Sequence, residues 1–206
     1  MSFGMRSLLV LLFVVPFQAV AAPDAWILSL GWSPQICDDS PGSREFQCLE
    51  ENYFRVHGLQ PLFRGDAPAC TEEPMSDVLL NQLMLDLPNR ARLRRVWKEQ
   101  GACSGLSAEN YAVQFSRGAR RLATPAAFTA VHDKLEMPAA DIKAAFVRVN
   151  PELTLDSIVL QCRRRYLSEV QVCVDANFQP RTCGVSTETS CKDVVKVRPI
   201  PLRKLR

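Results

Sequence analysis

The sequence predicts an α+β fold, and the order of its hydrophobic patterns is the main reason. Segments with the two-residue period of strands lie toward both ends of the chain, whereas segments with a helical period and capping residues fill the middle. Strands and helices that are segregated along the chain favour α+β over α/β. Because neither an internal repeat nor a linker is visible, we expect one domain over residues 22–206, ending in a basic C-terminal tail.

The expected strands are short runs of alternating or β-branched apolar residues. The first covers residues 26–32, where alternate apolar side chains share one face. A second covers residues 53–57, and Gly58 is expected to end it. Three more are expected near the C-terminus, over residues 158–162, 169–174 and 193–197.

The expected helices are recognised by their caps and by apolar residues at helical spacing. Ser76 is a suitable N-cap for a first helix, and Pro88 is expected to end it. A second helix over residues 90–100 would stop at Gly101. Further helices are expected from Ser107 to about Leu122 and from starting points near Pro125 and Pro138.

The N-terminal residues predict a signal peptide. Arg6 precedes an apolar run over residues 7–17, and Ala19-Val20-Ala21 supplies small residues at the spacing of a cleavage site. The run is shorter than the roughly 20 residues that a membrane-spanning helix needs. We therefore expect cleavage after Ala21, a secreted or periplasmic protein, and no membrane attachment after cleavage.

The cysteines agree with export. The chain has eight, all of them after residue 21, and an even number in an oxidising compartment is typical of a disulfide framework. No Cys-x-x-Cys pair occurs, and His57 and His132 have no ligand spacing to the cysteines, so we expect neither a metal nor another cofactor. The residues alone leave the pairing open.

The charge does not define a partner. The full sequence has a formal net charge of +3, which neither demands nor excludes an anionic ligand. Basic residues gather in two places, over residues 90–98 and over residues 192–206. Either group could face phosphate, but for the second we prefer the interpretation of a solvated tail.

His57 is the first candidate for chemistry. At the end of the expected second strand and followed by Gly58, its ring is expected to face a cleft. Imidazole titrates near neutral pH and can move a proton in either direction. A lone histidine is more often structural, so this assignment needs support from elsewhere in the chain.

That support comes from a resemblance. Residues 95–103 read Arg-Val-Trp-Lys-Glu-Gln-Gly-Ala-Cys, which resembles the second catalytic segment of the T2 ribonuclease family, His-Glu-Trp-x-Lys-His-Gly-Thr-Cys. Residues 57–61, His-Gly-Leu-Gln-Pro, resemble the family's first segment, His-Gly-Leu-Trp-Pro. The resemblance implies a central antiparallel sheet with helices packed on it. Further matches follow in order at residues 26–37, 160–162, 169–173 and 180–183.

The departures from the family pattern fall on the catalytic positions. The first-segment histidine of the family acts as general acid, a role that the resemblance assigns to His57. The last histidine of the second segment acts as general base, and here Gln100 occupies that position. The other replacements are Arg95 for a phosphate-holding histidine, Val96 for a glutamate, Glu99 for a lysine and Gln60 for a tryptophan that can stack on a base.

Glutamine cannot accept a proton at neutral pH, and the loss of a positioned base lowers a rate on the order of 10²–10⁴-fold. We therefore expect an exported T2-ribonuclease-like protein that retains an RNA-binding groove, while transphosphorylating cleavage is weak or lost. The expected partner is single-stranded RNA, and the protein is expected to be a monomer. The expected RNA contacts are Lys98, Gln60 and Tyr53.

Two other hypotheses remain open. In the first, the protein is an active endoribonuclease that forms 2′,3′-cyclic phosphates, with His57 as acid, Glu99 as base and Arg95 on the phosphate. Arg95 and Glu99 are four residues apart and therefore share one helix face. In the second, the same scaffold serves as a secreted protein-interaction or inhibitor module.

The resemblance also implies a disulfide pairing. One of these bonds would tie the loop after His57 to the end of the helix that carries Gln100, and would hold the two segments together. The implied pairs are Cys37–Cys48, Cys70–Cys103, Cys162–Cys191 and Cys173–Cys183.

Overall fold

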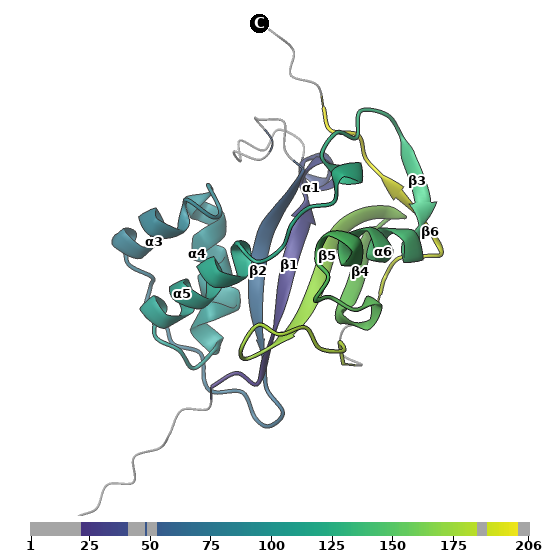
Figure 1. Ribbon diagram of the computed structural model, residues 1–206. Coiled ribbons are helices and arrows are strands. Elements are labelled where there is room, and N and C mark those ends of the chain that lie inside the picture. The colour runs from purple at the N-terminus through teal and green to yellow at the C-terminus, as the bar shows by residue number, and fades with distance from the viewer. Residues whose placement is uncertain (1–21, 41–47, 49–52, 185–188, 202–206) are drawn as a thin grey trace, which may run out of the picture.

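The computed structural model describes residues 22–40, 48, 53–184 and 189–201. The expected signal peptide, residues 1–21, and the end of the expected basic tail, residues 202–206, lie outside this part of the chain. The described residues form an α+β fold in which helices pack against a central sheet, as the sequence predicts (Figure 1).

The sheet has six strands in the order β2-β1-β5-β6-β3, and β4 pairs with β5 outside this path. The pairs are antiparallel except for β5 and β6, which are parallel where Tyr166 faces Lys196. The expected antiparallel sheet is therefore correct apart from this short contact. The strands are β1 (Ala25–Trp32), β2 (Phe54–Leu62), β3 (Leu135–Pro138), β4 (Ile158–Arg163), β5 (Tyr166–Asp175) and β6 (Val194–Val197).

Three helices stand beside β2, and a fourth lies against the β4–β5 side of the sheet (Figure 1). Ser76 and Ser107 accept the N-cap hydrogen bonds expected of them, and Asn89 does the same for the helix between. The helices are α1 (Ser33–Asp39), α3 (Asp77–Leu83), α4 (Arg90–Glu99), α5 (Ala108–Ala119) and α6 (Ala139–Val149), with a 3₁₀ turn at Gly101–Cys103.

Aromatic side chains make up much of the core between the sheet and these helices. Trp32 at the end of β1 contacts Phe54 of β2 and Phe128, and Phe54 also packs edge-on against Phe146 of α6. All four rings are at most 5% exposed. Each such aromatic pair stabilises the folded state by about 0.5–1.5 kcal/mol beyond the contribution of its buried area. Here the pairs join β1, β2 and α6.

Several sequence expectations are wrong in detail. Gly58 does not end the second strand, because β2 continues to Leu62 and pairs with β1 along its length. The helix expected from Pro125 is only a 3₁₀ turn at Ala126–Phe128, and the chain then forms β3 through pairing with β6. Helix α5 ends at Ala119 rather than at about Leu122. Helix α1, with a proline in its first turn, was not expected.

The four disulfides join the pairs that the family resemblance implies. The closest backbone approach is that of Cys70 and Cys103, whose Cα atoms are 4.0 Å apart. The other Cα distances are 5.5 Å for Cys37–Cys48, 4.9 Å for Cys162–Cys191 and 5.3 Å for Cys173–Cys183. Among the described residues, no helix has both the length and the apolar character needed to cross a bilayer.

Candidate functional site

His57 occupies a β-bulge in β2. Ser29 of β1 faces Gly58, and the next residue of β1, Leu30, faces Val56, so the bulge inserts His57 between these two pairs. A bulge turns the inserted side chain away from the regular alternation of the strand. The unusual position of His57 therefore comes from the register of two strands and not from a strand end.

The ring of His57 is buried. It packs over Gly31 of β1, where a Cβ atom would lie 2.6 Å from the ring Nδ1 and 2.6 Å from Cδ1 of Ile36. Only 3% of the His57 surface is exposed. The expectation of a ring that faces a cleft is therefore wrong, because glycine at position 31 leaves a space on the sheet that the ring fills.

Burial controls the protonation of this ring. It lowers the pKa of His57 to about 3, and the positive charge of Arg92 acts in the same direction. The imidazole is therefore neutral at neutral pH. A general acid must carry the proton that it donates, so the His57 ring in this environment lacks the proton that its expected role requires.

Side chains from α4 and α5 bind the backbone of β2 along its free edge. Arg92 Nη2 donates to the carbonyl oxygen of His57 at 3.1 Å. The Leu59 amide donates to Gln100 Oε1 at 2.9 Å, and the Tyr111 hydroxyl donates to the Leu59 carbonyl at 2.8 Å. Unpaired backbone groups of an edge strand are a liability, and these bonds satisfy three such groups, at His57 and Leu59.

Gln100, at the position of the family's general base, is therefore part of the structural framework. A Cβ atom at Gly58 would lie 2.5 Å from Gln100 Oε1, so the amide approaches β2 as closely as it does because residue 58 is glycine. Arg92, Val96 and Gln100 recur every four residues and lie on the face of α4 that meets β2. The amide oxygen accepts a hydrogen bond there but offers no basic group.

Arg95 and Glu99 lie elsewhere on α4. Both are exposed, whereas Val96 between them is buried. No salt bridge among the described residues joins Arg95 to Glu99. The helix does place the two on one side, as their spacing predicts, but it points them to solvent while His57 is enclosed.

The three expected RNA contacts lie apart from one another. Gln60 is exposed on β2 opposite Ile27, and Tyr53, just before β2, is 38% exposed. Lys98 instead lines a cavity of about 580 Å³ on the flank of α4 that faces away from β2. The structure thus puts Tyr53 and Gln60 toward opposite ends of the strand that carries His57, and Lys98 away from both.

The loop after β2 is fastened to the end of α4. Besides the Cys70–Cys103 disulfide, the Thr71 amide donates to the Ala102 carbonyl at 2.9 Å. Trp97 Nε1 donates to the Glu73 carbonyl at 2.8 Å. These contacts hold α4 in the position from which Arg92 and Gln100 reach β2.

Arg92 is the residue that the sequence analysis missed. It was counted only within the basic run of residues 90–98, yet it bonds the His57 carbonyl and affects the charge of the ring. Its Nε atom is buried and has no hydrogen-bond partner in the described part of the chain. Its spacing of four residues to Val96 and eight to Gln100 was the signal in the sequence that the three share one helix face.

No group of three or more described His, Cys, Asp or Glu residues could hold a metal ion.

Comparison with known proteins finds sequence relatives and fold neighbours that are named ribonucleases. No family model matches the chain. A ribonuclease of Aeromonas hydrophila is 34% identical over 89 residues, which cover 43% of this chain and 41% of that protein. A probable ribonuclease of Haemophilus influenzae is 30% identical over 117 residues, which cover 46% of this chain and 41% of that protein. The chain thus spans about two fifths of the length of the curated relatives it matches.

Solved structures show the same fold at lower identity. Trichomaglin, described as a novel S-like ribonuclease, has a TM-score of 0.67 at 17% identity, covering 86% of this chain and 98% of its own. An RNase-related protein from Calystegia sepium has a TM-score of 0.61 at 20% identity, covering 88% and 98%. Ribonuclease MC1 from bitter gourd seeds has a TM-score of 0.58 at 19% identity, covering 84% and 98%. Mutants of RNase MC1 have been solved with 5′-UMP and with 5′-GMP.

Proposed function

We propose that the chain is an exported member of the T2 ribonuclease family that binds single-stranded RNA without cleaving it efficiently. The observation that carries this proposal is the bond between Gln100 Oε1 and the Leu59 amide. Through this bond Gln100, which occupies the position of the family's general base, holds the edge strand β2. The scaffold of the family is thus present, while the group expected to start the reaction serves another purpose.

The chemistry explains why this arrangement disfavours cleavage. In transphosphorylation the 2′-hydroxyl loses its proton to a base, its oxygen attacks phosphorus, and the 5′-oxygen leaves with a proton from an acid. Gln100 cannot take the first proton, and neutral His57 has no second proton to give. Each loss lowers the rate on the order of 10²–10⁴-fold. The proposal of weak or lost cleavage rests on both.

Binding of RNA is the part of the proposal that the surface supports. Tyr53 is partly exposed next to the His57 strand and presents a ring on which a base can stack, an interaction of about 1–3 kcal/mol. Gln60 is exposed on the same strand and offers an amide for hydrogen bonding. Arg95 on the neighbouring helix is an exposed cation that can meet a phosphate.

Export is proposed on two grounds. Residues 1–21 have the pattern of a cleaved signal peptide, and four disulfides are typical of proteins that fold in an oxidising compartment. N-terminal sequencing of the protein isolated from its natural compartment is expected to begin at Ala22. A start at Met1 would contradict the proposed cleavage.

An active enzyme with reassigned roles has weaker support. It requires His57, Glu99 and Arg95 to act on one phosphate, but His57 is buried while Glu99 and Arg95 are exposed to solvent. His57 would have to leave its place over Gly31 and gain a proton before it could act as acid.

The test is a paired assay on one purified protein. Binding of a labelled single-stranded RNA at low salt and release of 2′,3′-cyclic phosphate are measured for wild type and for Glu99→Gln, an exposed substitution that leaves the fold intact. We expect binding by both proteins and no cyclic phosphate above background. Cyclic phosphate that disappears in Glu99→Gln would establish the reassigned enzyme. Absence of RNA binding at low salt would overturn the proposal and favour a protein-interaction module.

A further inference from the structure

The hairpin between β4 and β5 closes with two arginines in an unfavourable backbone conformation. Arg163 pairs with Tyr166, so Arg164 and Arg165 form a two-residue loop. Their φ angles are 51° and 74°. Two positive φ values in such a loop are the mark of a type I′ turn, for which Asn-Gly is strongly preferred. Left-handed backbone costs roughly 1–2 kcal/mol at a residue with a Cβ.

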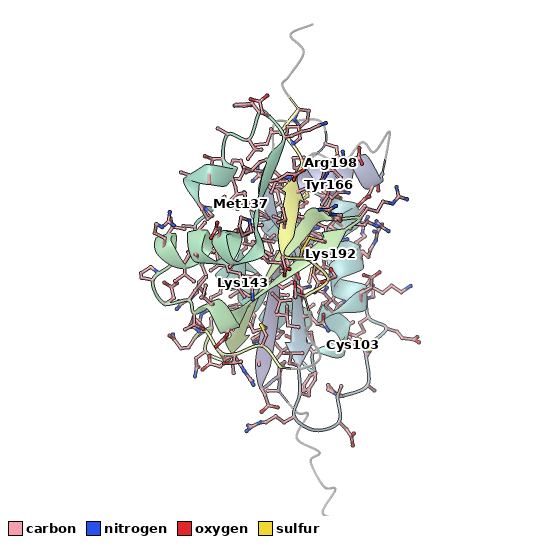
Figure 2. All side chains as sticks on the ribbon, turned by 90° about the vertical axis from the view of Figure 1, so that its right-hand side faces the viewer. Cys103, Met137, Lys143, Tyr166, Lys192 and Arg198 are labelled. Atoms are coloured by element: carbon pink, nitrogen blue, oxygen red, sulfur yellow. A yellow bond between two sulfur atoms is a disulfide. The ribbon has the colours of Figure 1, made fainter. Side chains whose placement is uncertain are left out.

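The cations at the base of this turn are neutralised by carboxylates. Arg198 also lies over the ring of Tyr166, with its guanidinium carbon 4.2 Å from the ring centroid, and Figure 2 shows the two side chains together. These contacts fix the base of the hairpin. The ion pairs are Arg163–Asp39 at 3.3 Å, Arg198–Asp38 at 2.6 Å and Lys196–Glu136 at 3.1 Å.

The two arginines of the loop are different. Both are exposed, and neither side chain takes part in an ion pair or a hydrogen bond within the part of the chain that the structure describes. A rigid turn thus presents two guanidinium groups to solvent above a neutralised base. Strained backbone that persists at a surface site is an observation from which a functional role can be inferred.

We propose that the Arg164–Arg165 turn is a second contact for the phosphates of single-stranded RNA, separate from the β2–α4 edge, the surface on which Tyr53, Gln60 and Arg95 are exposed. This inference rests on the proposed function. The planar guanidinium group binds phosphate with two parallel hydrogen bonds, which suits it to a nucleic-acid backbone. The turn lies between two and three strand spacings from β2 and about five residues along β5 from Val170, which is level with the bulge. It is therefore roughly 20–25 Å from His57. One RNA chain can therefore reach both places.

RNA fits the turn better than a lipid surface does. A segment that binds at a membrane interface buries apolar side chains among the lipids. None of the large apolar side chains that are exposed in the described residues lies in the turn. Tyr166, which follows it, is covered by Arg198, and Leu167 is fully buried. The turn therefore offers charge without an apolar anchor.

The test replaces the loop by its preferred sequence. The double variant Arg164→Asn/Arg165→Gly removes both charges and relieves the backbone, so it is expected to be at least as stable as wild type. The control variant Arg121→Gln/Arg148→Gln also removes two positive charges, but from positions outside the hairpin. Binding of a labelled single-stranded RNA longer than the span to His57 is measured from low to physiological salt. A third variant, Tyr53→Ala/Gln60→Ala, probes the β2–α4 edge.

We expect the hairpin variant to bind several-fold more weakly, with a log–log salt slope smaller by about 1.4 for two lost phosphate contacts. The Arg121/Arg148 control is expected to change the slope by less than half as much. An unchanged affinity and slope of the hairpin variant, with loss in the Tyr53/Gln60 variant, would overturn this inference and leave the proposed function standing. If the hairpin variant loses affinity for RNA and the Tyr53/Gln60 variant does not, the result supports the inference and contradicts RNA binding at the β2–α4 edge.

Two remaining results also contradict the inference. If wild type binds no RNA, both the inference and the proposed function fail. If the hairpin variant loses binding to vesicles with anionic lipids but binds RNA as wild type does, the turn serves a membrane surface and not RNA.

Discussion

The β2–α4 edge and the β4–β5 turn use polar side chains in opposite ways. At the edge, Arg92 and Gln100 bind backbone groups of β2, so position 100 of the second catalytic segment stabilises the fold. At the turn, the side chains of Arg164 and Arg165 make no hydrogen bond or ion pair with the described residues, although the backbone conformation of both is unfavourable. The difference indicates that polar side chains at the sheet edge hold the fold together, whereas those at the turn are exposed on its surface.

The largest expected effect concerns the disulfide that holds the edge. In the chain-entropy model, Cys70→Ser/Cys103→Ser lowers the free energy of unfolding by about 4 kcal/mol, because the bond closes a loop with a sequence separation of 33. The matched pair Cys173→Ser/Cys183→Ser, with a separation of 10, is expected to lower it by about 3 kcal/mol. Denaturant unfolding of both proteins measures the difference. The reverse order would show that the edge does not depend on this bond.

Substitution of Gln100 tests whether the base position has become structural. Gln100→Ala leaves the part-buried Leu59 amide without its acceptor and is expected to lower the free energy of unfolding by about 1–3 kcal/mol. Glu99→Ala, one residue earlier and exposed, is expected to change it by less than about 0.5 kcal/mol. Chemical denaturation of the two variants provides the comparison. Equal stability of both would contradict the structural role of Gln100.

Gly31 tests the packing of the His57 ring. In Gly31→Ala the new Cβ would stand 2.6 Å from the ring and from Ile36, so we expect a loss of about 1–3 kcal/mol through displacement of these groups. Gly65→Ala is the control, because a Cβ there meets nothing within 4 Å. Thermal unfolding of the two variants measures the effect. A Gly31→Ala protein as stable as the control would mean that the ring does not rest on β1.

The last expected effect is a pH dependence of stability, about 2 kcal/mol between pH 7 and pH 5. The unfolded chain binds a proton at His57 below about pH 6.5, whereas the folded protein resists it until about pH 3. Stability from this residue is therefore complete above pH 6.5 and falls as the pH drops, by at most about 1.4 kcal/mol per pH unit. Unfolding between pH 7 and 5 is expected to show this slope in wild type and in His132→Gln, but not in His57→Gln. An equal slope in all three proteins would contradict a His57 ring that is buried and neutral.

Local signals predicted much of the helical part of the fold. Ser76 and Ser107 cap the helices that their sequence context indicates, and the family resemblance gave all four cysteine pairs. What the sequence could not give depends on contacts between distant residues. The four residues of β3 are a strand only because β6 pairs with them, and this pairing replaced the helix expected after Pro125.

The candidate site was harder to predict than the fold. The resemblance identified positions 57, 95, 99 and 100, but not the direction in which their side chains point. The bulge that encloses His57 depends on the register between β1 and β2. The role of Gln100 depends on how closely α4 approaches Gly58. Neither is encoded in a local pattern, so the motif indicates candidate positions but not whether their side chains are buried.

The protonation of His57 is the most direct test of the account. An NMR pH titration follows the ring resonances of the two histidines, and His132→Gln assigns them. We expect the His57 resonances to stay those of a neutral imidazole from pH 8 to below about pH 4, because the ring is buried beside Arg92. A His57 midpoint near pH 6.5 would contradict the account, since a solvent-accessible ring that is protonated near neutral pH could still serve as the general acid of a ribonuclease.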